Sequence, residues 1–262
     1  MTLRRIRTAT VLRTAAVAAV AAVLAGGATA LASQATTPAP VQEPGQPPNV
    51  ALVEQQVEAY YGDSVDAQGQ HHASADSQWG RQTAAAIADA RRYLNLRLAG
   101  GAHRPAIVLD VDDTSEVTYG WEVDNQFAYN AASAEQAIDD DQFPAIAPTL
   151  ALARYAAAHG VAVIFLTGRP EHQRTATLTD LTGQGYPQPA AAYLKTESGA
   201  TPPPYLTCGT TCTTDQYKSL TRAHIQAQGY DIVLNVGDQY SDLSYGHEDK
   251  AVKLPNPMYY LP

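Results

Sequence analysis

The feature that most constrains this chain is the alternation of short apolar runs with stretches of helical character. Runs typical of buried strands cover residues 106–110, 162–167 and 232–236, with weaker candidates at 191–194 and 251–254. The helical stretches between them cover residues 147–159, 170–183 and 215–229. Strands that alternate with helices form a parallel sheet sandwiched by helices. The sequence therefore predicts an α/β fold over residues 101–262.

A smaller helical element is predicted ahead of the sheet, over residues 49–100. Asn49 has the side chain of an N-cap and is followed by apolar residues at helical spacing. The polar residues 62–75 predict a loop, and a second helix is expected to begin near Asp76 and to end at Gly100. The apolar stripe of that helix would run through Trp79, Thr83, Ile87, Ala90, Leu94 and Leu98.

The first 32 residues have the pattern of an export signal. Four Arg residues precede an Ala-, Val- and Leu-rich stretch, and Ala30-Leu31-Ala32 is the small-residue pattern that signal peptidase cleaves. The alternative is a transmembrane anchor, but Ala inserts weakly into a bilayer. Residues 33–48 are rich in Pro, Thr and Gln and predict a linker. We therefore expect a secreted chain with no stable membrane anchor after cleavage.

The charge of the chain restricts its partners. The formal net charge is −9, and four of the 17 basic residues lie within the predicted signal. Nucleic acid is an unsuitable partner for so acidic a chain. A small anionic substrate would also be repelled unless its site gathered local positive charge.

Cys208 and Cys212 are the two cysteines of the chain and lie in a CGTTC loop. In the oxidising compartment that export implies, a disulfide between them is favoured. The alternative is a metal site, which two thiols without a nearby His or third Cys support poorly.

Carboxylates crowd the residues that follow the first predicted strand. Asp110, Asp112 and Asp113 would repel one another unless a cation or a shared proton relieved them. On an extended strand end, Asp110 and Asp112 would project to the same side, so that one could attack while the other handled a proton. The alternative is an Asp-rich surface turn.

Polar residues also follow the other strong strand candidates. Thr167-Gly168-Arg169 precedes a helix expected to start at Pro170, and together these would form an anion seat. Asp238 and Asp242 follow the strand candidate at 232–236 and are four residues apart. Their carboxylates would suit Mg²⁺, which prefers oxygen ligands. Lys218, early in a predicted helix, would by itself be a solvated surface charge.

The joint order of these four elements is more specific than any one of them. Asp-x-Asp-x-Thr, a strand ending in Thr-Gly-Arg, a Lys and Gly-Asp-x-x-x-Asp resemble the four motifs of the haloacid dehalogenase-like (HAD) superfamily. The stretches YKSLTRAHIQAQGYDIVLNVGDQYSDL and KLPNPMYYLP resemble the plant acid phosphatase and vegetative storage protein group. DVDDTSEVTYGWE is similar to bacterial class C acid phosphatases. Together these point to the acid phosphatases of HAD subfamily IIIB.

This resemblance implies a Mg²⁺-dependent hydrolysis of small phosphate monoesters, with Asp110 as nucleophile and Asp112 as general acid and base. It implies that Thr167, Gly168, Arg169 and Lys218 hold the phosphate. The implied metal ligands are Asp110, the backbone carbonyl of Asp112, Asp238 and Asp242. Two alternatives stay open: a storage or binding protein on the same fold, and another HAD hydrolase such as a nucleotidase or dehalogenase.

Several other residues have less specific patterns. Asp139-Asp140-Asp141 indicates a solvated turn more than a second metal site, and His71-His72 indicates a surface loop. His172 could approach a substrate. Tyr119 and Trp121 could equally stack on a leaving group or belong to the core.

Overall fold

The computed structural model describes residues 45–261. The predicted signal segment, and the linker as far as residue 44, lie outside the described residues, and residues 46–49 contain no helix or strand. Residues 47–262 form one compact unit. None of the helices described combines the length and the hydropathy that crossing a bilayer requires.

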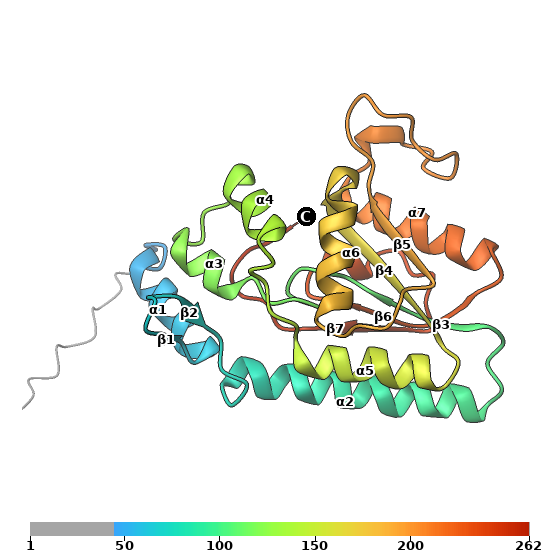
Figure 1. Cartoon of the computed structure of the whole chain (residues 1–262), viewed down its shortest axis with the longest axis horizontal. Helices are drawn as coiled ribbons and strands as arrows, with labels where there is room; N and C mark the ends of the chain where they lie inside the picture. Colours follow the sequence, from blue (N-terminus) through green and yellow to red (C-terminus); the bar gives the residue numbers. More distant parts are fainter. Residues whose placement is uncertain (1–44, 262) are drawn as a thin grey trace, which may run out of the picture. The chain divides into compact units, whose positions relative to one another are not determined.

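A five-stranded parallel sheet forms the centre of this unit (Figure 1). Its strands lie in the order β5 (Ala191–Lys195), β4 (Ala162–Pro170), β3 (Pro105–Leu109), β6 (Asp231–Gly237) and β7 (Lys250–Lys253). In the register, Leu109 of β3 lies opposite Phe165 of β4 and Val236 of β6. The carboxyl ends of the three central strands therefore meet at one edge. The predicted α/β fold is confirmed.

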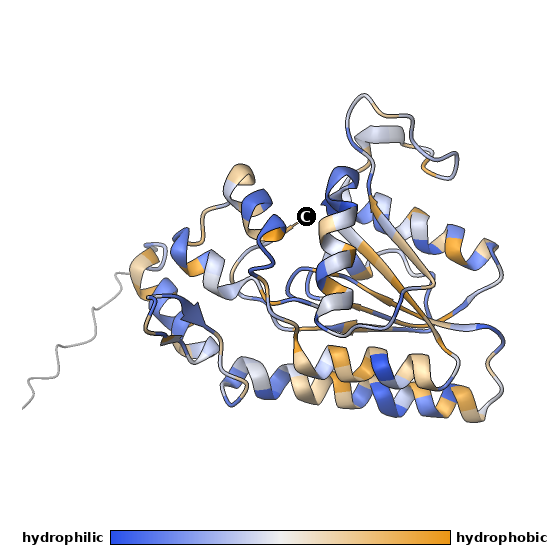
Figure 2. Cartoon of the chain, viewed as in Figure 1, coloured by the Kyte–Doolittle hydropathy of each residue, from blue (hydrophilic) through white to orange (hydrophobic). Residues whose placement is uncertain are grey.

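Helices cover both faces of this sheet. Successive side chains of a strand point to opposite faces, so Ile107 and Leu109 join one cluster while Ala106 and Val108 join another. The first cluster includes residues of α2 (Gln78–Ala99), α5 (Ala147–Ala158) and α6 (Arg174–Gly183), and the second includes residues of α7 (Thr214–Ala227). Figure 2 shows the hydrophobic character of α5 and of the central strands. Each fully buried Leu or Ile in these layers stabilises the fold by roughly 1.5–3 kcal/mol.

The two N-terminal helices agree closely with the sequence. In α1 (Val50–Tyr61), the side chain of Asn49 accepts a hydrogen bond from the Leu52 amide, and Gly62 ends the helix in the left-handed conformation. The N-cap of α2 is Ser77, one residue after the expected start. The predicted stripe of α2 is buried from Trp79 to Leu94, and Leu98 is partly buried.

Several short elements within this unit were not expected. Residues 62–75 contain a two-stranded antiparallel hairpin, β1 (Ser64–Val65) and β2 (His71–His72). Between β3 and α5 the chain forms α3 (Tyr119–Asp124) and α4 (Ala131–Asp139). These elements are two to nine residues long, and α3 has no side-chain cap, so their periodicity is too short to be distinctive.

The prediction that a helix starts at Pro170 is wrong. Strand β4 continues through Pro170, which pairs with Lys195 of β5. A 3₁₀ turn, Glu171–Gln173, follows, and α6 begins only at Arg174. Pro170 has an extended backbone, because pairing with the neighbouring strand outweighs the preference of Pro for a helix start.

Candidate active site

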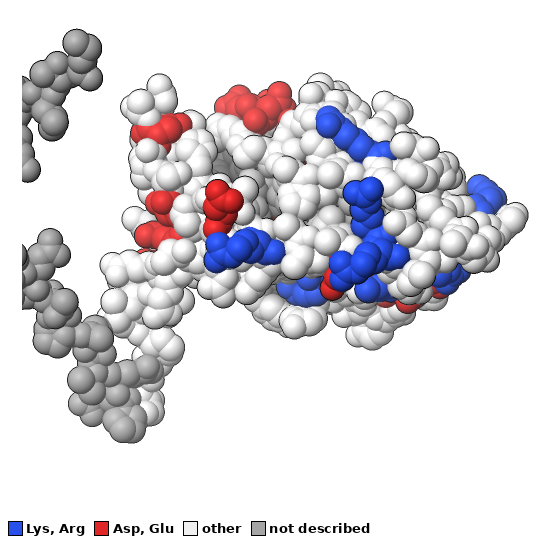
Figure 3. Space-filling view, turned by 90° about the horizontal axis from the view of Figure 1, so that it is seen from below, with Lys and Arg blue, Asp and Glu red and all other residues white. Residues whose placement is uncertain are grey.

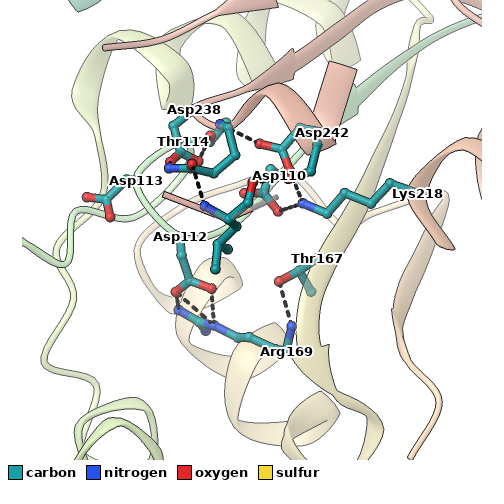
Figure 4. Close-up of polar contacts among 12 residues, drawn as sticks. Asp110, Asp112, Asp113, Thr114, Thr167, Arg169, Lys218, Asp238 and Asp242 are labelled. Carbon is teal, nitrogen blue, oxygen red and sulfur yellow. Dashed lines mark hydrogen bonds and ion pairs between the residues drawn. The ribbon is translucent and has the colours of Figure 1, made fainter. Parts of the chain in front are cut away.

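Asp110 lies directly after β3, in the middle of the carboxyl edge. Its amide donates to the carbonyl of Val236 in β6 at 3.0 Å, and its own carbonyl accepts from the Ser115 hydroxyl at 2.6 Å. The amides of Ser115 and Glu116 turn back to the carbonyl of Val111. These bonds make the segment after β3 a tight loop and hold the Asp110 side chain at the end of the sheet (Figure 4).

Asp110 shares this position with two carboxylates from the segment that follows the neighbouring strand β6. One carboxylate oxygen from each of Asp110, Asp238 and Asp242 lies within 4.8 Å of the others, and all three residues are buried. Asp238 follows β6, and Asp242 belongs to α8 (Tyr240–Leu243). Within residues 45–261 this is the one group of three or more acidic, His or Cys side chains close enough to share an ion.

Lys218 of α7 enters the same group from another element. Its Nζ donates to Oδ1 of Asp110 at 2.7 Å and to Oδ1 of Asp242, and its side chain is only 4% exposed. The expectation of a solvated surface charge, derived from Lys218 alone, is therefore wrong. Three carboxylates and one ammonium leave two excess negative charges, which a divalent cation would neutralise.

The protonation of these groups follows from burial and from mutual repulsion. Burial raises the pKa of Asp110 well above its ordinary value, against the opposing effect of the Lys218 ammonium. Burial and the neighbouring Asp242 raise the pKa of Asp238 to about 7. Burial would lower the pKa of Lys218, but Asp110 and Asp242 outweigh it and raise that pKa. Lys218 is therefore charged at any physiological pH, and a bound cation would favour the ionised carboxylates.

Asp112 points away from this group and toward Arg169. Nη2 of Arg169 lies 2.7 Å from Oδ1 of Asp112 and 2.7 Å from Oε2 of Glu116. The Asp112 side chain is 30% exposed, whereas Arg169 and Glu116 are buried. Burial raises the pKa of Glu116 to about 8, although the Arg169 guanidinium acts in the opposite direction. The guanidinium that was predicted to hold phosphate thus contacts two carboxylates.

Thr167 and Gly168 occupy the end of β4 as predicted. Thr167 is buried, and its hydroxyl accepts a hydrogen bond from the Arg169 amide at 3.1 Å. Gly168 is exposed, and a Cβ added to it would meet no atom within 4 Å. The backbone at Gly168 is therefore open to a ligand.

The family profile described as HAD superfamily, subfamily IIIB (Acid phosphatase), matches residues 32–262. The chain belongs to this family. Acid phosphatase 1 of Solanum lycopersicum is 31% identical over 171 residues, which cover 62% of this chain and 61% of that protein. The Stem 28 kDa glycoprotein of Glycine max is 31% identical over 135 residues, 51% of this chain and 50% of that protein. The match thus spans between one half and about three fifths of these relatives.

The fold of this acid phosphatase family member is also found among solved structures. The class C acid phosphatase of Bacillus anthracis superposes with a TM-score of 0.58 at 22% identity, over 80% of this chain and 86% of that one. At this identity the similarity concerns the fold. It confirms the HAD-like sheet that the four motifs predicted.

Further residues complete the hydrogen bonding of the site carboxylates. No role for these residues was predicted from the sequence. Oδ1 of Asp238 accepts from the Thr114 hydroxyl at 3.1 Å, and Oδ2 accepts from Gln239 and Asn256. Glu116 contacts Arg169 from the loop after β3. The acidic pattern of the loop could have pointed to Glu116, whereas Asn256 lies in a stretch noticed only for its resemblance to relatives.

Asp113 has a structural position beside the acidic group. Its backbone is left-handed, with φ 50°, and its carboxylate accepts from the amide and hydroxyl of Thr118 and from the hydroxyl of Tyr259. Burial raises the pKa of Asp113 to about 7. Gly237, just before Asp238, is needed for close packing, because a Cβ there would lie 2.4 Å from Cβ of Asp242.

The less specific candidates lie outside the acidic group. Tyr119 is fully buried against Tyr61, which places it in the core. Trp121 is partly buried between Tyr129 and Phe143. His172 is exposed and pairs with Glu135 and Glu197. His71 and His72 pair with Asp63 and Asp66, and Asp139, Asp140 and Asp141 are exposed.

The disulfide between Cys208 and Cys212 is present, which confirms that prediction. Its loop packs against the α7 face of the sheet, where Cys212 is buried. On the face seen in Figure 3, most acidic side chains lie toward the left of the view, and most Lys and Arg side chains lie toward its centre and right. At the carboxyl edge, the buried Lys218 contacts Asp110 and Asp242, and the buried Arg169 contacts Asp112 and Glu116.

Proposed function

We propose that this protein is an acid phosphatase that hydrolyses small phosphate monoesters through an aspartyl-phosphate on Asp110. The observation that carries the proposal is the position of Asp110. It lies at the carboxyl end of β3, in contact with Lys218 and within ligand distance of Asp238 and Asp242. Family membership supports the same reaction class.

In the proposed first step, a carboxylate oxygen of Asp110 attacks phosphorus in line, and the bond from phosphorus to the ester oxygen breaks. Asp112 donates a proton to the departing oxygen, so that an alcohol leaves. In the second step, Asp112 takes a proton from water as that water attacks phosphorus. The bond to Asp110 then breaks, inorganic phosphate leaves, and both side chains return to their starting states.

The residues present fit a divalent cation. Asp110, Asp238 and Asp242 offer buried oxygen ligands of the kind that Mg²⁺ prefers, and together with Lys218 they leave two excess negative charges. With the backbone carbonyl of Asp112, they would hold the ion. When bound, it would neutralise negative charge and orient the phosphoryl group.

The phosphate would lie between the ends of β3 and β4. The exposed Gly168 backbone and the Thr167 hydroxyl would donate to its oxygens, and the Lys218 ammonium would stabilise charge as it develops. Arg169 would orient Asp112 and would not hold phosphate, because its guanidinium already contacts two carboxylates.

The test is phosphate release by the purified protein from an alkyl phosphate, an aryl phosphate, a nucleotide and a sugar phosphate, with and without a chelator. We expect release that the chelator abolishes and added Mg²⁺ restores. A correctly folded protein that releases no phosphate would support the storage or binding alternative. Release of halide from a haloacid instead would support a dehalogenase.

We also propose that the protein is exported and cleaved near Ala32. The disulfide between Cys208 and Cys212 and the similarity to a plant glycoprotein support this location. N-terminal sequencing of protein collected from culture medium tests it. A full-length chain retained in the cytoplasm would contradict it.

A further inference from the structure

The last described residues, 254–261, form a segment that we call the C-terminal strap. It begins where β7 ends, and the Leu254 amide donates to the carbonyl of Gly237 at 2.9 Å. Leu254 is buried in the sheet core, and Met258 is buried in a cluster with Tyr61 and Trp79. Apolar contacts thus hold the strap at Leu254 and at Met258, and the residues between these two pass the carboxyl edge of the sheet.

Two side chains of the strap reach the carboxylates at this edge. Nδ2 of Asn256 donates to Oδ2 of Asp238 at 2.8 Å. The hydroxyl of Tyr259 donates to Oδ2 of Asp113 at 2.8 Å. The strap therefore links the loop after β3 to the loop after β6, which together supply the acidic group.

The orientation of Asn256 is itself held in place. Its Oδ1 accepts from the Met258 amide at 2.8 Å, which directs Nδ2 toward Asp238. Gln239 donates to the same Asp238 oxygen at 2.7 Å. These two amide donors on Oδ2 restrict rotation of the Asp238 carboxylate. Its Oδ1, which accepts from Thr114, is turned away from them.

Tyr259 acts on the other loop. Asp113 has a left-handed backbone, which is unfavourable for a residue with a Cβ unless surrounding contacts stabilise it. Its carboxylate accepts from Thr118 and Tyr259, and these contacts hold the turn. The turn determines the direction of the backbone carbonyl of Asp112, which precedes it.

We infer that the C-terminal strap is part of the metal-binding apparatus, with Asn256 and Tyr259 as positioning residues for Asp238 and for the turn at Asp113. Hydrogen-bonding partners that orient ligating carboxylates typically contribute 10-fold to 100-fold to metal affinity. This inference rests on the metal site of the proposed function.

The experiment compares four forms of the whole protein: the unmodified chain, Asn256→Ala, Tyr259→Phe and Tyr260→Phe. Magnesium binding is measured by calorimetry and by the rise in Tm with Mg²⁺ concentration. Tyr260 is a matched control, because it is the adjacent tyrosine and is 72% exposed. We expect Asn256→Ala and Tyr259→Phe to weaken Mg²⁺ binding about 10-fold, and Tyr260→Phe to leave it unchanged.

Measurement of turnover separates a defect in Mg²⁺ affinity from a general loss of structure. With saturating Mg²⁺, the two strap variants should recover kcat to within about threefold of the unmodified enzyme, because their defect is in metal affinity. Circular dichroism without metal checks the fold, and Tyr259→Phe keeps the test valid if Asn256→Ala fails to fold, since it removes one oxygen atom only.

Two negative outcomes can be told apart. Equal Mg²⁺ affinity in all four forms overturns the role of the strap and leaves the proposed function intact. Absence of Mg²⁺ binding by the unmodified chain overturns the metal site of the proposed function, and the inference with it.

Discussion

Arg169 holds Asp112 through a forked ion pair. Nη2 and Nε of Arg169 lie 2.7 Å and 3.1 Å from Oδ1 of Asp112, and Nε lies 3.2 Å from Oδ2. Contacts of this kind add directional specificity as well as attraction. The same Nη2 also donates to the buried Glu116, and Nη1 donates to the hydroxyl of Thr177. Arg169 thus orients Asp112, the proposed proton donor. Contacts with Glu116 and Thr177 hold Arg169 in its turn.

Asp112→Asn should reduce turnover most for poor leaving groups. An alkyl oxygen needs a proton as it departs, whereas an activated aryl oxygen departs more readily without one. We expect the loss for an alkyl phosphate to exceed the loss for an aryl phosphate by about 10-fold or more. Steady-state rates on both substrates measure the ratio. Equal losses would show that Asp112 does not protonate the leaving group.

Arg169→Lys tests whether the guanidinium orients Asp112 or binds phosphate. A Lys ammonium is a point charge and cannot reproduce the fork, so Asp112 should lose its orientation. We expect the selectivity between aryl and alkyl phosphates to shift in the same direction as in Asp112→Asn. If Arg169 holds phosphate instead, KM should rise by a similar factor for both substrates.

Asp110→Asn should abolish turnover while the protein stays folded. The amide has the size of the carboxylate but cannot attack phosphorus, so the rate should fall by several orders of magnitude. It also removes one charge from the acidic group, so the Tm of the metal-free protein should stay equal or rise. Initial rates and thermal unfolding measure the two effects. Near-normal activity in a folded variant would remove Asp110 as nucleophile.

The metal-free protein should be more stable at about pH 5 than at about pH 8.5. Burial raises the pKa of Asp113 and Asp238 to about 7 and that of Glu116 to about 8, so the folded state binds protons that the unfolded state releases. Their contribution is complete below the unfolded pKa values and is lost as the pH rises through the folded ones. Urea unfolding across this range measures it.

Two comparisons make that pH dependence specific. Glu116→Gln should flatten the upper part of the profile, because an amide does not titrate. Added Mg²⁺ should raise Tm more at high pH than at low pH, since metal ligands must be deprotonated. A Tm shift independent of pH would argue against carboxylate ligands with raised pKa values.

Replacing both Cys208 and Cys212 by Ser should lower the free energy of unfolding by about 2 kcal/mol, the loop-closure value for so short a loop. The loop packs on the α7 face of the sheet, so we expect the Mg²⁺ requirement to be unchanged. Urea unfolding of the oxidised protein and the double variant gives the difference. A changed Mg²⁺ requirement would mean that the loop influences Lys218, which follows it on α7.

Most of the sheet was predictable because its signals are local. A buried strand is a run of a few apolar residues, and a parallel register brings the ends of β3, β4 and β6 to one edge. The positions of Asp110, Thr167 and Asp238 follow from that rule alone. The short α3 and α4 were missed, because one or two turns of helix have too little periodicity to be recognised.

The sequence by itself determined which chemical groups meet at the carboxyl edge, and the tertiary structure decided how each of them is used. Nothing near Arg169 in sequence indicates whether its guanidinium meets phosphate or Asp112, 57 residues away. Tyr259 and Asp113 are 146 residues apart, and their contact depends on the burial of Met258 in a cluster built from other helices. Local patterns reflect backbone preference and burial, whereas the pairing of a donor with a distant carboxylate depends on the packing of the whole chain.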